Sequence, residues 1–508
     1  MKILSAEKTK ELDQYTIEHE PVKSIDLMER AARSCVSRLL KLADINSEFW
    51  IVCGKGNNGG DGLAIARLLS IQGFTVKAII VDYKKTFSED AQTNFNQLKE
   101  KFPIRIHEIH SLEEFKQLIS GEKNNTDVLI VDALVGTGIN KPVEGLLEEV
   151  IQIINDNFSK IISIDVPSGL YVDKSSSENK TIIQSSLTLT FQFPKISFLF
   201  AENKKYVPEF EILDIGLSRA GIELQASNFY YITRQEISSL LKPRSKFSHK
   251  GTFGHALLLA GSIGKSGAGL IASRACLRSG AGLLTLHSNK ETVTALLTHL
   301  PEAMSSVDPN LAFISEIDKP ELFDAIAFGP GTGTHIDTQT AFKKILQYYT
   351  GKLIVDADGL NILSENKTWL NFLQPGTILT PHPKEFERLT EKHTDDFERL
   401  KAAKHFSLKY NCILILKSAH TAICMPDGNV FFNSSGNPGL AKGGSGDALT
   451  GIILGLLARG YNAPQSALIG TFIHGYAADL CVKKKSAESL LISDVIEMLP
   501  RAFKKLED

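Results

Sequence analysis

Residues 436–451 have the sequence GNPGLAKGGSGDALTG, a glycine-rich segment that leads directly into an apolar, helix-like stretch at residues 448–458. Gly443, Gly444 and Gly446 carry no Cβ, so consecutive backbone N–H groups can point into one concavity. The N-terminus of the following helix adds the positive end of its dipole. The segment therefore predicts an anion-binding turn, and we expect the anion to be a phosphate.

One carboxylate, Asp447, stands in the first turn of that helix, where it would repel a phosphate unless it served another purpose. A carboxylate beside a phosphoryl group can accept the proton of a hydroxyl that attacks the phosphorus. The alternative is that Asp447 only caps the helix, because aspartate at an N-terminus satisfies free N–H groups. The glycines packed around it favour the catalytic interpretation.

The composition places the chain among soluble globular proteins. Its 508 residues are too many for a single core of ordinary size, so two or three domains are expected. The content of 43% hydrophobic and 22% charged residues is typical of a folded chain. A net charge of −2 argues against a general polyanion binder, so we expect no nucleic-acid partner. The lysine run at residues 483–485 is expected to be a solvated helix end.

The cysteines and the apolar runs bear on location. Six cysteines are scattered without a C-x-x-C pair, which indicates neither a zinc site nor a disulfide framework and fits a reducing compartment. The first residues become charged too early for a signal peptide, and no apolar run approaches the ~18 residues of a membrane span. We therefore expect a cytoplasmic protein with small-molecule partners and no membrane partner, assembled as a homo-oligomer.

Short apolar runs alternate with amphipathic stretches in two series, a pattern typical of parallel sheets covered by helices on both faces. The first series predicts strands at residues 49–53, 75–81, 127–131, 160–164 and 187–191, with helices near 63–72 and 146–155. The second predicts strands at 255–260, 283–287, 325–328, 352–355, 377–379 and 412–416. Residues 217–227 lack strand alternation, so we expect domains at 1–217 and 225–508. The fold class is α/β, with two different domains because their motifs do not repeat.

In the first domain, a glycine-rich segment follows the first strand. Gly54, Gly56 and Gly59 satisfy the dinucleotide pattern G-x-G-x-x-G, and Asp82 follows the next strand as a ribose-binding acid would. This favours a Rossmann dehydrogenase as one alternative. The polar side chains at residues 57–61 are more than a plain pyrophosphate turn requires, which weakens that alternative.

Two further loops end at the same edge of this sheet, where ligands bind in open α/β folds. They have the sequences DALVGTG at 132–138 and DVPSG at 165–169. Asn58, Asp132 and Ser168 offer oxygen ligands to a hard cation, and Asp165 remains available for proton transfer. Each acid taken alone could equally be a helix cap or a hydrogen-bond acceptor at a strand end.

NNGGDG (57–62) and DALVGTG, with IDVPSG (164–169) and FPK (193–195), resemble the NAD(P)H-hydrate epimerase domain over roughly residues 5–217. That resemblance implies a Rossmann-like fold and a substrate, NADH or NADPH hydrated at C6 of the nicotinamide ring, whose C6 epimers are interconverted. It implies potassium on Asn58, Asp132 and Ser168, and proton transfer by Asp165 with Lys195. The implied substrate-binding residues are Asn57, Asn58, Gly59, Gly60, Asp61, Gly136, Thr137, Gly138, Ile139, Asn140, Lys141, Pro142 and Asp165.

Three motifs of the second domain fail a closer check. Gly264-Lys265-Ser266 ends like a P-loop, but the required first glycine falls at Leu259. The segment DADG at 356–359 begins like a calcium loop, but Leu360 stands where an oxygen ligand is needed. His382 and Glu385 look like a metal pair, yet Pro383 between them argues against one continuous helical face that carries both.

The glycine-rich segments of this half resemble, in order, the ribokinase-like NAD(P)H-hydrate dehydratase domain over roughly residues 229–506. That resemblance implies conversion of the S hydrate to NAD(P)H at the expense of ADP or ATP, with Mg²⁺ and with Asp447 as the catalytic base. Ser418 departs from the usual Lys-Gly pair. The implied hydrate-binding residues are Gly331, His382, Pro383, Lys384, Glu385, Phe386, Glu387, Arg388 and Asp447. The implied nucleotide-binding residues are Lys417, Ser418, Ala419, His420, Thr421, Asn437, Pro438, Gly439, Leu440, Ala441, Lys442, Gly443, Gly444, Ser445 and Gly446.

The combined hypothesis is a bifunctional enzyme that repairs hydrated nicotinamide cofactors, with ADP as the expected co-substrate because the fused forms of bacterial type resemble this chain. Two alternatives stay open. One is a Rossmann oxidoreductase fused to a small-molecule kinase, and the other is a nucleotide-sensing regulatory protein without turnover.

Overall fold

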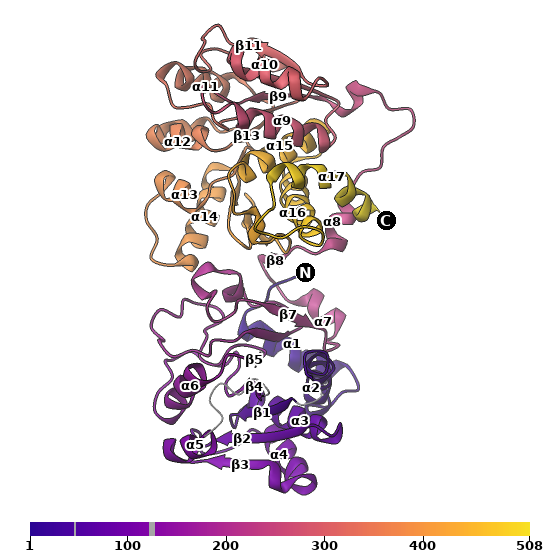
Figure 1. Cartoon of the computed structure of the whole chain (residues 1–508), viewed down its shortest axis with the longest axis vertical. Coiled ribbons are helices and arrows are strands. Elements are labelled where there is room, and N and C mark those ends of the chain that lie inside the picture. The colour runs from indigo at the N-terminus through magenta and orange to yellow at the C-terminus, as the bar shows by residue number, and fades with distance from the viewer. Residues whose placement is uncertain (45–46, 121–127, 508) are drawn as a thin grey trace. The chain divides into compact units, whose positions relative to one another are not determined.

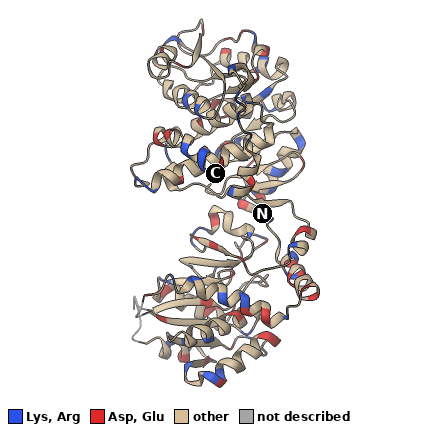
Figure 2. Cartoon of the chain, turned by 90° about the vertical axis from the view of Figure 1, so that its right-hand side faces the viewer, with Lys and Arg blue, Asp and Glu red and all other residues tan. Residues whose placement is uncertain are grey.

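The computed structural model describes residues 1–44, 47–120 and 128–507 and divides into two compact units (Figure 1). One unit is Lys2–Ser227, and the other is Asn228–Asp508 together with Met1. Each contains its own sheet and helices, which confirms the predicted α/β class with two different domains. Lys and Arg are interspersed with Asp and Glu over the ribbon of each unit (Figure 2).

The sheet of the first unit is parallel throughout its described strands, in the order β3-β2-β1-β4-β5-β6-β7. The strands are β1 (Glu48–Cys53), β2 (Thr75–Val81), β3 (Ile106–Ile109), β4 (Val128–Ala133), β5 (Ile161–Ile164), β6 (Leu187–Phe191) and β7 (Phe210–Leu213). All five predicted strands are present, although Asp127, the predicted start of β4, lies outside the described residues. The strand order reverses between β1 and β4, and this is where a doubly wound sheet opens its ligand crevice.

Alternation along β1 shows why helices cover both faces of this sheet. Phe49 and Ile51 belong to a core cluster on one face, packed against α2 (Ser24–Leu39) and α3 (Asn57–Ile71). Trp50 and Val52 belong to the cluster on the other face, with α5 (Leu112–Leu118) and α6 (Leu146–Asn157). Figure 1 shows α5 and α6 on one side of the strands and α2 and α3 on the other. Side chains of both parities are therefore buried, as a parallel sheet between two helix layers requires.

Helix α3 begins earlier than predicted. The prediction that the helix starts near Leu63 was wrong, because α3 runs from Asn57 and Gly56 is its N-cap. The NNGGDG segment is thus the first turn and a half of the helix. Its exposed N–H groups and polar side chains lie at the carboxyl edge of the sheet, where the helix N-terminus is positive.

The region predicted to separate the domains contains a short helix that packs on the first unit. Gly221 of α7 (Arg219–Leu224) lies so close to α1 (Ala6–His19) that a Cβ there would come within 2.7 Å of Tyr15 and 2.8 Å of Leu12. The Lys2 ammonium donates to the carbonyls of Ile222, Glu223 and Gln225 at 2.7–2.9 Å. Residues 218–227 therefore close the first unit.

The sheet of the second unit has the order β11-β10-β9-β12-β13-β14-β15-β16-β17-β8, parallel except for the antiparallel β15-β16-β17. Its strands are β8 (Phe229–Tyr231), β9 (His255–Leu259), β10 (Leu283–Ser288), β11 (Met304–Val307), β12 (Ala325–Phe328), β13 (Lys352–Val355), β14 (Ile378–Leu379), β15 (Ile413–Leu416), β16 (Ala422–Cys424) and β17 (Val430–Phe432). The six predicted strands are all present. Its order also reverses, between β9 and β12, so a second crevice opens at the carboxyl ends of its strands.

Two helices of this unit pack backbone against backbone. A Cβ at Gly451 of α15 (Ser445–Ala458) would lie 2.1 Å from the carbonyl oxygen of Ala272, and one at Gly455 would lie 2.4 Å from that of Cys276. Both carbonyls belong to α9 (Ser266–Arg278). With α16 (Ala463–Val482) and α17 (Ile492–Glu507), these helices build the larger core cluster of the unit. The contact fixes α15, whose first turn carries Asp447.

The remaining helices of the second unit include α8 (Arg234–Leu240), α10 (Lys290–His299), α11 (Ile336–Tyr348), α12 (Asp358–Glu365), α13 (Pro383–Leu389) and α14 (Asp396–Tyr410). The first unit also contains α4 (Glu89–Lys101). Within the described ranges, no helix is both long and apolar enough to cross a bilayer.

Candidate active sites

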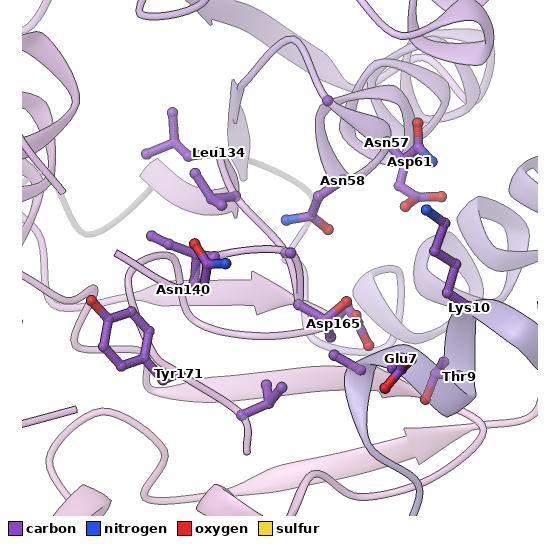
Figure 3. Close-up of a pocket in the computed structure, with 18 of the residues that line it drawn as sticks. Glu7, Thr9, Lys10, Asn57, Asn58, Asp61, Leu134, Asn140, Asp165 and Tyr171 are labelled. Carbon is purple, nitrogen blue, oxygen red and sulfur yellow. The ribbon is translucent and has the colours of Figure 1, made fainter. Parts of the chain in front are cut away.

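A cavity of about 1040 Å³ opens at the carboxyl edge of the first sheet. Figure 3 shows Asn58, Asp61 and Asp165 pointing into it from α3 and from the segment after β5. Among the predicted substrate-binding residues, the lining includes Asn57, Asn58, Asp61, Gly136, Thr137, Gly138, Ile139, Asn140 and Asp165. Gly59 and Gly60 serve packing instead: a Cβ at Gly59 would lie 1.8 Å from the Gly54 carbonyl, and one at Gly60 would lie 2.8 Å from Met28. Lys141 and Pro142 continue the segment beyond the lining residues.

Asp132 is completely buried at the end of β4 and accepts four hydrogen bonds from neutral donors. The donors are the hydroxyls of Ser163 (2.8 Å) and Ser168 (2.5 Å) and the N–H groups of Ser168 (2.9 Å) and Leu134 (3.3 Å). Burial raises the pKa of Asp132, and these hydrogen bonds oppose the rise without cancelling it. The predicted ligands Asp132 and Ser168 are thus in direct contact with each other.

The third predicted ligand, unlike the other two, lacks hydrogen-bond partners. Asn58 is 8% exposed, and neither its amide oxygen nor its amide nitrogen has a hydrogen-bond partner in the described structure. Unpaired polar atoms in a buried side chain cost free energy, so such a group is expected to meet a ligand, an ion or water.

Asp165 follows β5 with a φ of 62°, a left-handed conformation that turns the chain sharply at the cavity. Its carboxylate lies 3.0 Å from the ammonium of Lys195, which is 3% exposed. The hydroxyl of Thr190 also donates to the carboxylate, at 3.3 Å. The structure therefore joins the predicted pair Asp165 and Lys195 as a buried ion pair at the cavity wall.

Two more carboxylates, those of Asp13 and Asp61, line this cavity. Asp61 lies in a sequence motif, whereas Asp13 does not. Asp13, on α1, lines the cavity with Asp61 and Asp165. Burial and the neighbouring Asp165 raise the pKa of Asp13 to about 7, while Lys195 acts in the other direction. Burial, followed by the charges of Asp165 and Asp13, raises the pKa of Asp61 well above its usual range. Asp13 precedes every glycine-rich motif, so only the folded position of α1 associates it with the site.

The residue proposed for ribose binding in a dehydrogenase is engaged elsewhere. The Asp82 carboxylate lies 2.5 Å from the Lys55 ammonium and 2.9 Å from Nδ1 of His110. Hydrogen bonds from Lys55, and more weakly from His110, lower the pKa of Asp82 despite its partial burial. These contacts weigh against the Rossmann dehydrogenase alternative.

In the second unit, Asp447 is the third residue of α15, as predicted, and Gly444 is the N-cap with a φ of 88°. Burial raises the pKa of Asp447 to about 6, and the charge of Asp356 adds to the rise. A Cβ at Gly443 would meet nothing within 4 Å, so the backbone there is open to a ligand. The turn thus combines accessible backbone with a carboxylate that can exchange a proton near neutrality.

Beneath this turn lies a charged pair that the sequence motifs did not reveal. Asp356, 1% exposed, lies 3.0 Å from the ammonium of Lys417 and accepts a hydrogen bond from the Thr450 hydroxyl at 2.8 Å. Burial alone would raise the pKa of Asp356, but Lys417 and the hydrogen bonds lower it overall. A Cβ at Gly446 would come within 3.5 Å of Lys417 and 3.6 Å of Asp356. The predicted nucleotide contact Lys417 therefore lies directly below the glycine turn.

The predicted hydrate-binding segment forms the start of α13. His382 and Glu385 form a capping box, in which Nδ1 of His382 accepts from the Glu385 N–H and the Glu385 carboxylate accepts from the His382 N–H. Pro383 is the first residue of the helix, which explains why it does not separate them. The Glu385 carboxylate also lies 3.8 Å from Lys417. Phe386 is fully buried, so it supports the segment from the core.

The rest of the glycine-rich segment is anchored to α16. Asp479 accepts hydrogen bonds from the Gly436 N–H (2.9 Å) and from the Asn437 amide (2.8 Å). The Lys442 ammonium donates to the Glu488 carbonyl at 2.6 Å. Nowhere in the described ranges do three or more His, Cys, Asp or Glu side chains form a ready metal site.

Comparison with known proteins identifies both halves. A family model described as NAD(P)H-hydrate dehydratase matches residues 256–501, and one described as YjeF-related protein N-terminus matches residues 24–197. A protein of Bacillus subtilis, solved with ATP and Mg²⁺ and described as an ADP/ATP-dependent NAD(P)H-hydrate dehydratase, is 32% identical. It aligns over 56% of this chain and 100% of its own length, with a TM-score of 0.49.

Full-length relatives match across both halves. Bifunctional NAD(P)H-hydrate repair enzymes of Moorella thermoacetica and Thermofilum pendens are 32% and 33% identical over 530 and 520 residues. The alignments cover all of this chain and 98% and 97% of the relatives. The corresponding protein of Escherichia coli is 30% identical over 94% of this chain and 89% of its own length. The resemblance carried by the motifs is confirmed, and the chain belongs to the family of bifunctional NAD(P)H-hydrate repair enzymes.

Proposed function

We propose that this chain repairs hydrated nicotinamide cofactors in two steps. The first unit interconverts the R and S forms of NADHX and NADPHX, which differ at C6 of the nicotinamide ring. The second unit dehydrates the S form to NADH or NADPH at the expense of ADP, releasing AMP and phosphate. The observation that carries the proposal is the position of Asp447 at a glycine-capped helix N-terminus, directly above the Lys417–Asp356 pair.

Asp447 accepts the proton of the C6 hydroxyl, and the hydroxyl oxygen attacks the terminal phosphorus of the nucleotide. Its pKa of about 6 leaves it mostly ionised at neutral pH but still able to take a proton. Backbone N–H groups of the turn and the Lys417 ammonium stabilise the charge on the transferring group. The resulting phosphate ester leaves as phosphate while the ring nitrogen releases electrons, and loss of a proton from C5 restores the dihydropyridine ring.

The charges of the second site fit a magnesium–nucleotide complex. Four carboxylates, those of Asp356, Asp358, Glu385 and Asp447, surround two lysines, Lys265 and Lys417. The excess negative charge would repel a nucleotide that arrived without a cation. Mg²⁺ usually binds through one or two carboxylates with phosphates and water, and we assign it to this group of carboxylates. When bound, the ion neutralises phosphate charge.

In the first unit, Asp165 moves the proton at the C6 hydroxyl, and the ammonium of the buried Lys195 stabilises the ionised form of Asp165. Asn57, Asp61 and residues 136–140 would surround the hydrate in the cavity. The walls exclude bulk water from the reacting carbon, which strengthens the interaction between Asp165 and the substrate.

Potassium fits the neighbouring residues. Asn58 has an unpaired amide oxygen, and Asp132 is a buried carboxylate without a cationic partner, so a monovalent cation would satisfy both. Asn58, Asp132 and Ser168 are the residues we assign to it. When bound, the ion stabilises negative charge at the end of β4.

The proposal is tested by measuring phosphate release with purified R and S hydrates, in separate reactions with ADP and with ATP. We expect phosphate and NADH from the S form with ADP at once, and from the R form only after epimerisation. Absence of phosphate with both nucleotides would favour a nucleotide-sensing protein. Hydride transfer to an added substrate would favour the oxidoreductase alternative.

A further inference from the structure

The first cavity contains more acid groups than the proposed proton transfer uses. Asp13, Asp61 and Asp165 line it together, and Lys195 is the cation paired with one of them, Asp165. Lys10 also lines the cavity, yet three ionised carboxylates in a partly buried space would repel one another strongly. At least one of the acids must therefore keep its proton when the site is at rest.

The fold holds Asp13 firmly in this position. At the start of α1, the Ala6 N–H donates to the Asp173 carboxylate at 2.8 Å, which ties the helix to the cavity wall. Further along, the Thr16 hydroxyl accepts from the Ser218 N–H at 3.1 Å, and Gly221 packs against Leu12 and Tyr15. Within the described residues, the Asp13 carboxyl takes part in no hydrogen bond and no ion pair. Such a group is anchored by its helix but free to meet a ligand.

Resting on the proposed epimerase function, we propose that Asp13 is a second catalytic residue, the acid that protonates the departing C6 hydroxyl while Asp165 acts as the base. Asp13 donates its proton to the hydroxyl oxygen, the C6–O bond breaks, and water leaves with the bonding electrons. The lone pair of N1 forms the N1=C6 double bond. Water then adds to the opposite face of C6, Asp165 takes one of its protons, and the π electrons return to N1.

The two carboxylates exchange roles in the reverse direction. After one turnover Asp13 is ionised and Asp165 is protonated, so the site is ready to convert the other epimer or to reset through solvent. Asp13 suits this cycle, because burial and Asp165 raise its pKa to about 7, where gain and loss of a proton are both accessible. Asp61 is less suited, since it is more deeply buried than Asp13 and the charges of Asp165 and Asp13 add to burial in raising its pKa well above its usual range.

The test uses the full-length chain with the purified R hydrate and no nucleotide, so that only epimerisation is observed. We expect Asp13→Asn to lower the epimerisation rate by about 10²-fold or more. The matched control is Glu11→Gln, because Glu11 lies on the same helix with its side chain 46% exposed and pairs with Lys8. That variant makes the same change from carboxyl to amide on the same helix and should retain the rate. Dehydration of the S hydrate with ADP reports whether the proposed second activity is intact in each preparation.

A pH profile separates catalysis from a structural role. The groups around Asp13 are Asp165, Lys195 and Asp61 from other elements, Asp173 on the cavity wall, and Glu7 and Lys10 on α1. The unmodified rate should fall above pH 7 as Asp13 loses its proton, and this falling limb should be absent from the residual activity of Asp13→Asn. If Asp13→Asn does not fold, Asp13→Glu decides, since its falling limb should move to a different pH.

An Asp13→Asn rate within threefold of the unmodified chain, or a falling limb that Asp13→Glu leaves in place, overturns the assignment. Failure of the unmodified chain to epimerise either hydrate would instead contradict the proposed function of the first unit, so the two failures are distinguishable.

Discussion

Asp132 and Asp356 occupy matching places in the two units, yet their charges are controlled in opposite ways. Each is at most 1% exposed at the carboxyl edge of a parallel sheet. Asp132 accepts four hydrogen bonds from neutral groups and still has a raised pKa. Asp356 has the Lys417 ammonium at 3.0 Å, and its pKa is lowered. A cation supplied by the protein thus lowers the pKa of a buried carboxylate, whereas the neutral donors around Asp132 leave its pKa raised.

The two sites therefore carry charge in different ways, each suited to its proposed reaction. The second site carries its own permanent cation, as a site that handles phosphates requires. The first site has acids whose pKa values are raised, as suits repeated proton transfer, and it offers a position where an external cation would pair with Asp132.

The largest expected effect is on the second site. Asp447→Asn should lower the dehydration rate by about 10² to 10⁴, or roughly 3 to 5 kcal/mol of transition-state stabilisation, because the amide cannot accept the hydroxyl proton. In the unmodified chain the same rate should fall below about pH 6, where Asp447 becomes protonated. Rates of phosphate release measure both effects.

Epimerisation by the same Asp447→Asn preparation should be unchanged, which serves as its control. If Asp447 only caps α15, the variant should keep its turnover, since asparagine is also a good cap. A dehydration rate within a few fold of the unmodified chain would remove Asp447 from the mechanism.

The second prediction removes the internal cation. Lys417→Met should lower the free energy of unfolding of the second unit by about 3 kcal/mol at neutral pH, because it leaves the Asp356 charge buried without a partner. The loss should shrink as the pH falls and Asp356 becomes protonated, since a lowered pKa stabilises the fold only while the group is ionised. Denaturant titrations at several pH values measure it.

Two further variants test whether the unpaired charge of Asp356 causes this loss of stability. Lys417→Met combined with Asp356→Asn should recover most of the lost stability. Ser163→Ala, which removes one neutral donor from Asp132, should cost only about 1 kcal/mol in the first unit. Equal losses for Lys417→Met and Ser163→Ala would contradict the contrast between the two carboxylates.

The smallest effect concerns the external cation. Replacing potassium by a bulky organic cation should slow epimerisation roughly tenfold, which corresponds to a loss of about 1.4 kcal/mol of transition-state stabilisation. Dehydration of the S hydrate should be nearly unchanged under the same conditions. Equal slowing of both reactions would argue against a potassium site confined to Asn58, Asp132 and Ser168.

The sequence predicted the central strands of both sheets because each is a continuous apolar run between turn signals. It did not predict the edge strands β3, β7 and β11, which are largely not buried, nor the short β16 and β17 with β8 beside them. Edge strands and three-residue strands carry little apolar patterning, and their pairing depends on neighbours distant in the chain.

In the candidate sites, too, the sequence identified only the residues that lie within local motifs. Asp165 and Asp447 stand within glycine-rich motifs, so the sequence alone singled them out. Asp13 comes from an ordinary amphipathic helix, and Thr450 reaches Asp356 across 94 positions of the chain. Asp356 itself lies in the DADG segment, whose local pattern suggests no more than an incomplete calcium loop. Such partners are defined by three-dimensional proximity, which no local pattern encodes.

Gly451 and Gly455 set a further constraint on how this chain can change during evolution. Any side chain at either position would collide with the backbone of α9 and displace α15, and with it Asp447, which lies about one turn from Gly451 and about two turns from Gly455. Selection for turnover should therefore hold both positions to glycine as strictly as it holds the catalytic aspartate. A survey that ranks residues by invariance would count these two glycines with the catalytic machinery, although neither has a side chain with which to touch a substrate.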